Sequence, residues 1–388
     1  MVSLISLEPH LDPVFRWIPQ HKLMERKMDF YRAFRDAIEF ALKERPDLLL
    51  FPGDLFFRVN PRIPTLAKVV RDIKEVYEKG VKVYAIAGHH DQPRGVTAGA
   101  SPLTVLHNAG YLHFFKSYHQ ISKNHLLIDG LDVCVAGVSY KPDVMPGEDP
   151  LEGVDMKLDG QVNILMLHYN IEGFHFFGNE PVVRLSSIPE NVQLVAAGHL
   201  HRHQHQTIGE TVICYCGSTE RVTFAEEGEP KGFVYMDVDR EGVQHIEHVE
   251  THARPMKTIE VYVPKEGDVT QHIIAKVDEF LSHYESSELP LLRIKLYGTF
   301  TRPVLRTYRR DIIIRHASER CFAVKLDDDE VKYATHEEVP EVRLESPLKE
   351  FEKYVRALIE KAKSEKERRL YEEVLKFGRK KLEEAGAW

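Results

Sequence analysis

Apolar side chains recur at helical spacing in two segments near the beginning of the chain, residues 22–44 and 63–79. The positions that would share one buried face of the first segment are Met24, Met28, Tyr31, Phe34, Ile38 and Ala41. The apolar runs LLLF and VKVYAIA follow these two segments and are typical of buried strands. Helix and strand patterns therefore alternate in this region, which indicates an α/β layer.

The pattern changes from Leu126 onward, where short β-rich runs follow one another with few helices between them. These runs are LLIDG, DVCVAGV, NILMLH, QLVAAGH, TVICYC and GFVYMDV. Both patterns fit one α/β core over residues 1–255, in which two sheets pack face to face as a sandwich and helices flank them.

A separate unit is predicted over residues 256–335. The strand-like runs KTIEVYVP, LLRIKLYGTF and CFAVKLDD alternate there with helical patterns near 269–283 and 302–316. This alternation predicts a small α+β domain. The acidic, proline-containing stretch 326–345 has the character of a connector.

Two helices are expected in the final segment, residues 336–388. Ser346 and Pro347 would begin the first helix, and Ser364 with Glu367 forms a capping-box pattern that would begin the second. Such a pair either packs on its own chain or docks a partner helix. Its place after a connector favours docking.

The composition is that of an ordinary globular protein, with 43% apolar and 29% charged residues in a chain of 388. A net charge of −8 argues against binding nucleic acid through bulk charge. It does not exclude nucleic acid, because bound divalent cations would reverse the field at a site. No targeting signal opens the chain and no apolar run approaches the ~20 residues that span a membrane, so we expect a cytoplasmic protein without membrane contact.

The cysteines do not form a paired C-x-x-C zinc motif. They are Cys134, Cys214, Cys216 and Cys321. We expect all of them to be small core residues in a reducing compartment.

Several of the apolar runs end at side chains that can bind a metal. The segments are Glu8-Pro9-His10, Gly53-Asp54, Gly88-His89-His90-Asp91, Leu167-His168 and Gly198-His199-Leu200-His201. A single histidine after a strand is more often a satisfied core or surface residue, but here the donors recur in one kind of place. Open α/β sheets present their chemistry at the carboxyl ends of strands, so we expect these donors to converge on one edge of one sheet. Histidine and aspartate at this density predict a two-metal hydrolase, with Asp54 as the natural bridging carboxylate.

The order of these segments resembles that of the calcineurin-like metallophosphoesterases. Within them it is similar to the SbcD / meiotic recombination eleven branch of DNA repair nucleases. Cys216-Gly217-Ser218-Thr219-Glu220-Arg221 and Lys231-Gly232-Phe233 match motifs of that branch, and residues 10–15 resemble its bacterial YhaO subgroup. The resemblance implies a nuclease core at 1–255, a capping domain that binds DNA at 256–335, and C-terminal helices that dock a coiled-coil ATPase.

The resemblance also implies a ligand set and a mechanism. Two divalent ions, with manganese expected and zinc or iron as alternatives, would hold a hydroxide that attacks phosphorus. The implied ligands are Glu8, His10, Asp54 and His201 for one ion, and Asp54, His89, His168 and His199 for the other. His90 would stabilise the transition state or protonate the leaving oxygen, and Asp91 would orient it.

Two of these ligands depart from the family pattern. The family has aspartate where this chain has Glu8, and asparagine where it has His89. Glutamate is longer by one methylene, and an imidazole favours zinc, iron or copper over magnesium. Three interpretations stay open: an active site with altered metal preference, a weakly active site, and a degenerate site kept for its shape.

Four arginines next to the site loops are candidates for phosphate contacts: Arg58, Arg62, Arg94 and Arg202. The alternative for each is a solvated surface charge.

We therefore predict a metal-dependent DNA exo/endonuclease subunit of a double-strand-break repair complex. By resemblance, its partners would be DNA, an SMC-like coiled-coil ATPase of the SbcC type and a second copy of the chain, paired through the first helices. The alternatives are a catalytically weak or silent scaffold for that ATPase and a phosphodiesterase for small substrates on the same fold.

Overall fold

The computed structural model describes residues 1–95, 99–175, 178–334 and 347–384. It divides into two compact units, one ending at Lys332 and the other beginning at Tyr333. The boundary predicted at 255/256 falls inside the first unit and stays a prediction. Part of the predicted connector and Ser346, the expected first cap of the C-terminal helices, lie outside the described residues.

The first sheet has six strands in the order β14-β13-β1-β2-β3-β4. Their bounds are β14 Gly242–Glu250, β13 Gly232–Asp239, β1 Val2–Ser6, β2 Leu48–Pro52, β3 Lys82–Ile86 and β4 His113–Phe114. Strands β1 to β4 run parallel, and β13 pairs antiparallel with β1. The carboxyl ends of β1, β2 and β3 consequently lie at one edge of this sheet.

The second sheet also has six strands, in the order β11-β12-β10-β7-β6-β5. Their bounds are β11 Gln204–Ile208, β12 Thr211–Tyr215, β10 Leu194–Ala197, β7 Val162–Leu167, β6 Leu131–Gly137 and β5 Ser122–Ile128. The inner strands β6, β7, β10 and β12 are parallel, whereas both edge strands pair antiparallel. A short pair, β8 (Asn170–Ile171) and β9 (Val182–Val183), lies outside both large sheets.

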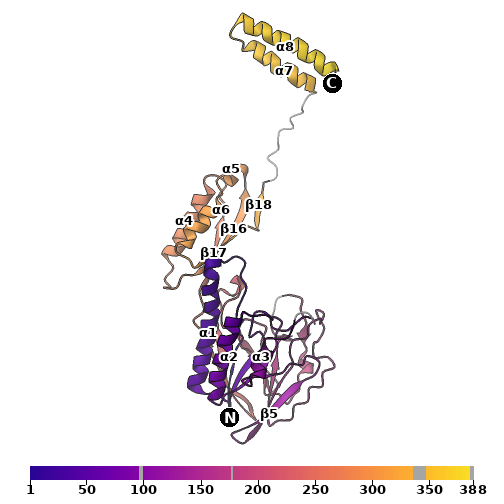
Figure 1. The fold of residues 1–388 in the computed structure, drawn as a ribbon, viewed down its shortest axis with the longest axis vertical. Helices are drawn as coiled ribbons and strands as arrows, with labels where there is room; N and C mark the ends of the chain where they lie inside the picture. Colours follow the sequence, from indigo (N-terminus) through magenta and orange to yellow (C-terminus); the bar gives the residue numbers. More distant parts are fainter. Residues whose placement is uncertain (96–98, 176–177, 335–346, 385–388) are drawn as a thin grey trace. The chain divides into compact units, whose positions relative to one another are not determined.

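The two sheets pack face to face, as predicted. One hydrophobic cluster joins their inner faces through residues such as Leu4 and Leu50 from the first sheet and Ile164 and Cys214 from the second. A second cluster joins the outer face of the first sheet to helices α1 (Leu23–Glu44) and α2 (Ile63–Glu78), which lie side by side (Figure 1). The predicted α/β sandwich flanked by helices is therefore confirmed.

Helix α1 buries a different face at its N-terminal end from the one predicted. Met24 is 54% exposed, while Arg26, Asp29 and Phe30 are buried there. Charged side chains can be buried when they are paired, and Arg26 donates to Asp29 (3.0 Å) and to the main chain at Arg221 (2.5 Å). The prediction for Met24 was wrong because apolar spacing carries no information about these distant partners.

Residues 256–333 form a third sheet with its own hydrophobic cluster. Its strands are β15 Met256–Tyr262, β16 Leu291–Phe300, β17 Ala323–Asp327 and β18 Val331–Tyr333. Helices α4 (Val269–Ser282) and α6 (Arg310–Ser318) lie side by side against this sheet (Figure 1). A short helix α5, Arg302–Leu305, precedes α6, so the helical pattern near 302–316 corresponds to two helices.

The second unit contains α7 (Pro347–Glu360) and α8 (Glu365–Glu384), which pack against each other. Ser364 Oγ accepts the backbone N–H of Glu367 (3.2 Å), so the predicted cap begins α8. The remaining helices are short: α3 Leu103–Asn108 and the 3₁₀ turns Gln20–Lys22, Leu185–Ser187 and Phe224–Glu226. Among the described residues, no helix combines the length and apolar character needed to cross a bilayer.

Candidate metal centre

The predicted donors converge, but they come from the matching edges of two sheets instead of one. Glu8, Asp54 and His89 follow the ends of β1, β2 and β3 in the first sheet, and His168 and His199 follow β7 and β10 in the second. The expectation of a single sheet was wrong, because alternating hydrophobicity does not say which strands pair with which. The facing sheets bring both sets of strand ends to one place.

The backbone at these strand ends is unusual in ways that serve close packing. His10, Asp54 and His199 have φ values of 50°, 49° and 90°, in the left-handed region that non-glycine residues rarely adopt. Gly88 has no room for a side chain, because a Cβ there would lie 2.2 Å from Asp54 Oδ1. Strained residues persist where the surrounding structure over-determines them, which is common at functional sites.

One group of donors consists of three imidazoles, His89, His168 and His199, with one ring nitrogen of each lying within 4.8 Å of the others. His89 Nδ1 lies 3.1 Å from His168 Nε2 and 3.1 Å from Asp54 Oδ2. The imidazole that replaces the family's asparagine therefore projects a nitrogen into the group.

A second group consists of Glu8, His10 and His201, again within 4.8 Å of one another. Glu8 Oε2 accepts the backbone N–H of His199 (2.9 Å), and Oε1 lies 3.6 Å from His10 Nε2. The extra methylene of glutamate is thus accommodated by an anchor after the end of β10 in the facing sheet, and one carboxylate oxygen remains directed into the group.

Asp54 lies between the two groups. Its Oδ2 is 3.4 Å from His10 Nε2 on one side and 3.1 Å from His168 Nε2 on the other. Burial would raise the pKa of Asp54, but the facing imidazoles of His168 and His89 hold that pKa well below its ordinary value. Burial would likewise lower the pKa of His168, and the Asp54 carboxylate instead raises it to about 9. Asp54 is therefore an ionised carboxylate in the position of a bridging ligand.

Several buried polar atoms in these groups lack a hydrogen-bond partner among the described residues. They are Glu8 Oε1, His10 Nδ1 and Nε2, Asp54 Oδ2 and His199 Nδ1. Unpaired buried polar atoms cost free energy unless a ligand satisfies them. Carboxylate oxygens and imidazole nitrogens are donors for divalent metals, so the residues present fit a metal pair.

Three of the imidazoles, those of His168, His199 and His201, have a partner on the ring nitrogen that faces away from these groups. His168 Nδ1 lies 2.8 Å from the carbonyl oxygen of Pro52, His199 Nε2 lies 2.7 Å from Glu180 Oε2, and His201 Nδ1 lies 3.2 Å from Glu226 Oε1. Metal-binding histidines almost always donate their second N–H in this way. In these three rings, the outward partner selects which nitrogen faces the groups.

Glu180 and Glu226 did not emerge from the sequence as site residues. Glu226 is buried and also pairs with Lys231 Nζ (2.8 Å), which donates to the carbonyl oxygen of His201 (2.9 Å). The motif Lys231-Gly232-Phe233 thus supports His201 through Glu226. A Thr223-x-x-Glu226 capping box is visible in the sequence, but its contact with His201 is not.

His90 lies beside both groups, but its expected partner, Asp91, accepts backbone N–H groups instead. Its ring stacks on Phe57 with centroids 4.3 Å apart, and burial lowers the pKa of His90 to about 3. Asp91 instead accepts the backbone N–H groups of Gly88 (2.8 Å) and Phe56 (3.3 Å). The described contacts therefore make Asp91 a support for the loop after β3, and they show Phe57 beside the His90 ring.

A ring nitrogen of His90 also lies within 4.8 Å of donors of His10 and Asp54. The exclusion of His90 from the ligands consequently stays a prediction.

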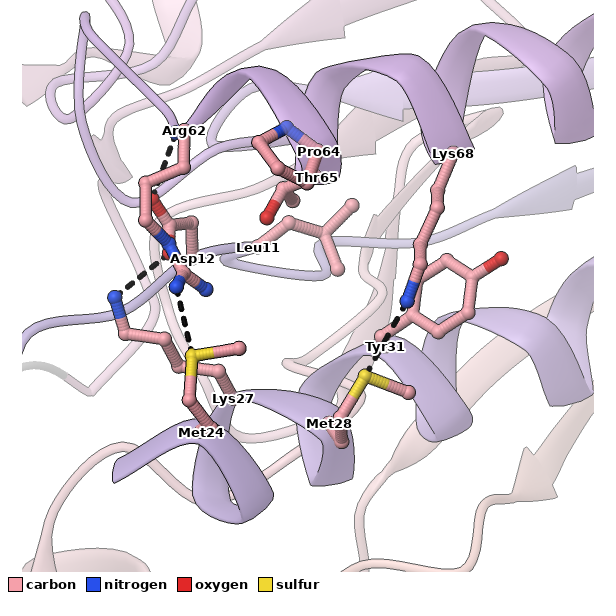
Figure 2. A pocket seen from close by; sticks show the side chains of 10 residues that line it. All are labelled: Leu11, Asp12, Met24, Lys27, Met28, Tyr31, Arg62, Pro64, Thr65 and Lys68. Atoms are coloured by element: carbon pink, nitrogen blue, oxygen red, sulfur yellow. Dashed lines mark hydrogen bonds and ion pairs between the residues drawn. The ribbon is translucent and has the colours of Figure 1, made fainter. Parts of the chain in front are cut away.

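Two of the arginines proposed for phosphate contacts are occupied by a buried carboxylate. Asp12 accepts Arg58 Nη2 (2.6 Å), Arg62 Nε (2.9 Å) and Lys27 Nζ (2.7 Å). Figure 2 shows Lys27 and Arg62 pointing at Asp12 on one side of a pocket between α1 and α2. These arginines hold the segment after His10 in place. Arg94 and Arg202 are exposed beside the site loops and stay candidates for phosphate contacts.

The segment Ser218–Arg221 joins the metal centre to the third sheet. Ser218 pairs with Glu8 in a parallel bridge, and the buried Glu220 accepts the backbone N–H of Arg254 (2.9 Å). Arg254 in turn donates to Asp29 Oδ2 (2.6 Å). The motif Cys216–Arg221, which the sequence shares with the resembled branch, therefore has a structural role in the described contacts.

Comparison with known proteins gives matching results. The model of the family described as calcineurin-like phosphoesterase matches residues 21–203, which contain Asp54 and all donors except Glu8 and His10. The DNA double-strand break repair protein Mre11 of Methanocaldococcus jannaschii is 28% identical over 232 residues, covering 56% of this chain and 58% of that protein. The Mre11 of Thermoplasma acidophilum is 26% identical over 303 residues, covering 75% and 76%. That of Sulfolobus acidocaldarius is 25% identical over 287 residues, covering 72% of each chain.

The predicted resemblance is thereby confirmed. Residues 21–203 match a calcineurin-like phosphoesterase domain, and the sequence resembles Mre11 proteins over much of its length. A domain of this kind implies divalent metal binding, for which the described histidine, aspartate and glutamate groups provide donors.

Proposed function

We propose that this chain is the nuclease subunit of a DNA double-strand-break repair complex and that it hydrolyses phosphodiesters with two divalent metal ions. The observation that carries the proposal is the convergence of Asp54 and two donor groups at facing strand ends, with buried donor atoms that have no partner within the described part of the chain. The names of relatives similar to this chain indicate DNA as the substrate.

Each ion has its own set of residues under this proposal. Glu8, His10, Asp54 and His201 would hold one, and Asp54 with the three imidazoles of His89, His168 and His199 would hold the other. Bound ions would polarise a phosphate and make hydroxide available near neutral pH. His90 stands outside the proposed ligand set and, as a neutral imidazole, would donate a hydrogen bond to the phosphate or the leaving oxygen.

Manganese is the expected metal, and His89 makes zinc or iron the main alternatives. A site with three imidazoles is softer than one in which an amide oxygen replaces one of them, and imidazole suits zinc and iron. The set that contains Glu8 keeps its oxygen donors and should retain the preference for manganese. The two ions of one chain would then differ in identity.

Two protein partners are proposed from exposed apolar surfaces. In the second unit, Tyr354 and Phe377 are both 67% exposed on the α7–α8 pair, as expected for a surface that docks an SMC-like coiled-coil ATPase of the SbcC type. In the first unit, Ile63 at the start of α2 is 80% exposed and Met24 on α1 is 54% exposed, which fits pairing of two copies through α1 and α2.

A nuclease assay with a panel of metals, with and without the ATPase, tests the proposal. We expect manganese-dependent cleavage of linear DNA that is lost in Asp54→Asn and His90→Gln while the circular dichroism spectrum is kept. Cleavage of small phosphodiesters without cleavage of DNA would instead support a small-substrate phosphodiesterase. Absence of bound metal at saturating manganese would support the silent scaffold.

A further inference from the structure

A separate group of metal-binding side chains lies at the outer part of the second sheet. It consists of His125 on β5, Cys134 on β6 and Asp159 in the loop before β7, with one donor atom of each within 4.8 Å of the others. Asp159 precedes the amino end of β7, whereas His168 follows its carboxyl end. A strand of this length spans about 20 Å, so the group is distinct from the metal centre.

The antiparallel register sets two of the donors side by side. His125 pairs with Cys134 across β5 and β6, so both side chains point to the same face of the sheet. Asp132 Oδ1 lies 2.9 Å from His125 Nδ1, and the other ring nitrogen, Nε2, lies 3.1 Å from Asp159 Oδ1. A carboxylate on one imidazole nitrogen, with the second nitrogen facing further donors, is the usual setting of a metal-binding histidine.

The third donor is held over the cysteine by a tightly packed loop. Gly160 lies so close to β6 that a Cβ on it would be 2.7 Å from Cys134 Cβ. Asn163 fixes this loop, because its Oδ1 accepts the N–H of Gly160 (2.9 Å) and its Nδ2 donates to the carbonyl oxygen of Gly160 (3.1 Å). The close packing and the hydrogen bonds of Gly160 therefore fix the backbone next to Asp159.

We propose that His125, Cys134 and Asp159 form a binding site for one zinc-type divalent transition metal, with Asp132 orienting the imidazole. A thiolate, an imidazole and a carboxylate are the donor types that zinc binds, at about 2.0–2.3 Å, so donors now within 4.8 Å need only close around an ion. The thiolate disfavours magnesium and manganese, which prefer oxygen. Water would complete a tetrahedron, and the ion would tie the edge strand β5 to the loop before β7.

One neighbouring charge opposes the ion. Lys123 Nζ lies 2.6 Å from the same Asp159 oxygen that faces His125. An incoming ion must displace this ammonium group or share the carboxylate with it. Removing the lysine charge should therefore strengthen metal binding, roughly twofold to fivefold, the range expected for an exposed ion pair that no longer has to be broken.

Cobalt substitution in the full chain, kept under reducing conditions, tests the site directly. Thiolate ligation gives Co²⁺ an intense near-ultraviolet charge-transfer band, and none of the donors proposed for the metal centre is a thiol. We expect the band in the parent protein, its loss in Cys134→Ser, and its retention in Cys321→Ser, which removes another buried thiol. Zinc content, measured by mass spectrometry after dialysis, should fall by one ion per chain in Cys134→Ser and stay unchanged in Cys321→Ser.

Two exposed positions keep the test decisive if Cys134→Ser fails to fold. His125→Ala and Asp159→Asn should each weaken the cobalt band at limiting metal, and Lys123→Met should strengthen it. A parent protein without the band would overturn the proposal. A band and zinc content unchanged by His125→Ala and Asp159→Asn would also overturn it, whatever the state of the metal centre.

Discussion

Glu8 and His89 occupy opposite halves of the candidate metal centre, and the structure treats them differently. Glu8 is fully buried and anchored by the N–H of His199, whereas His89 is 24% exposed at the rim beside Asp54 and His168. Replacing aspartate by glutamate changes the reach of an oxygen donor, and the anchor absorbs that change. Replacing asparagine by histidine changes the donor element itself. The departure at Glu8 therefore alters the geometry of the site, and the departure at His89 alters its metal chemistry.

The largest expected effect comes from breaking both halves at once. Asp54→Asn keeps the acceptor for the N–H of His90 (2.9 Å) but removes the charge shared by both donor groups. We expect cleavage to fall by on the order of 100- to 1,000-fold and both ions to be lost. Nuclease rates and metal content by mass spectrometry provide the measurement. Asp72→Asn removes another fully buried carboxylate and should keep both ions.

The two halves can be weakened one at a time through the carboxylates behind them. Glu226→Gln acts on His201 and Glu180→Gln acts on His199, and each should lower the affinity of its own ion by about tenfold. Titration with manganese, followed by calorimetry, should resolve one weakened and one intact site in each variant. Equal weakening of both sites in both variants would contradict the division into halves.

A smaller effect should separate geometry from metal chemistry. His89→Asn replaces a nitrogen donor by an oxygen donor, so the preference for zinc over manganese should fall on the order of tenfold. Glu8→Asp exchanges oxygen for oxygen and should weaken both metals alike. Metal content after equilibration with an equimolar mixture measures the ratio. An unchanged ratio in His89→Asn would show that His89 does not bind the ion.

The smallest effect concerns the arginines. Arg202→Ala should leave stability unchanged and reduce the salt dependence of DNA binding by about one charge. Arg62→Ala should instead destabilise the fold by roughly 1–3 kcal/mol, because the buried Asp12 loses an ion-pair partner. Fluorescence anisotropy at several salt concentrations and urea unfolding distinguish the two. The reverse pattern would assign the phosphate contact to Arg62.

The strand ends were predictable, because each donor follows an apolar run and parallel strands present their carboxyl ends together. The carboxylates that hold the imidazoles in place were not predictable, because they depend on contacts between distant residues. Glu180 reaches His199 from a loop with no periodic signal, and Glu226 reaches His201 across 25 positions. Asp91 looked like a partner for His90 because the two are adjacent in sequence. Two backbone N–H groups that the sequence cannot place take its oxygens.

For the basic residues too, the sequence showed their positions but not their partners. Arg58 and Arg62 follow a donor loop and carry the charge that a phosphate site needs. Only the fold reveals that Asp12, 46 positions before Arg58 and 50 before Arg62, accepts both. The exposed face of α1 was misjudged for a related reason, since Met24 satisfies the helical period while Arg26 occupies the buried side. Sequence patterns locate elements and their ends, and long-range ion pairs decide which polar residues are free.

The glycines at the strand ends limit how this centre can be redesigned. A Cβ at Gly53 would lie 2.2 Å from His168 Nδ1, one at Gly88 would lie 2.2 Å from Asp54 Oδ1, and one at Gly198 would lie 2.3 Å from the carbonyl oxygen of Pro52. Each collision is with a donor or with the backbone that holds one. A mutant library aimed at new metal specificity should therefore keep these three codons fixed and vary Glu8 and His89, where the scaffold already tolerates a change of ligand.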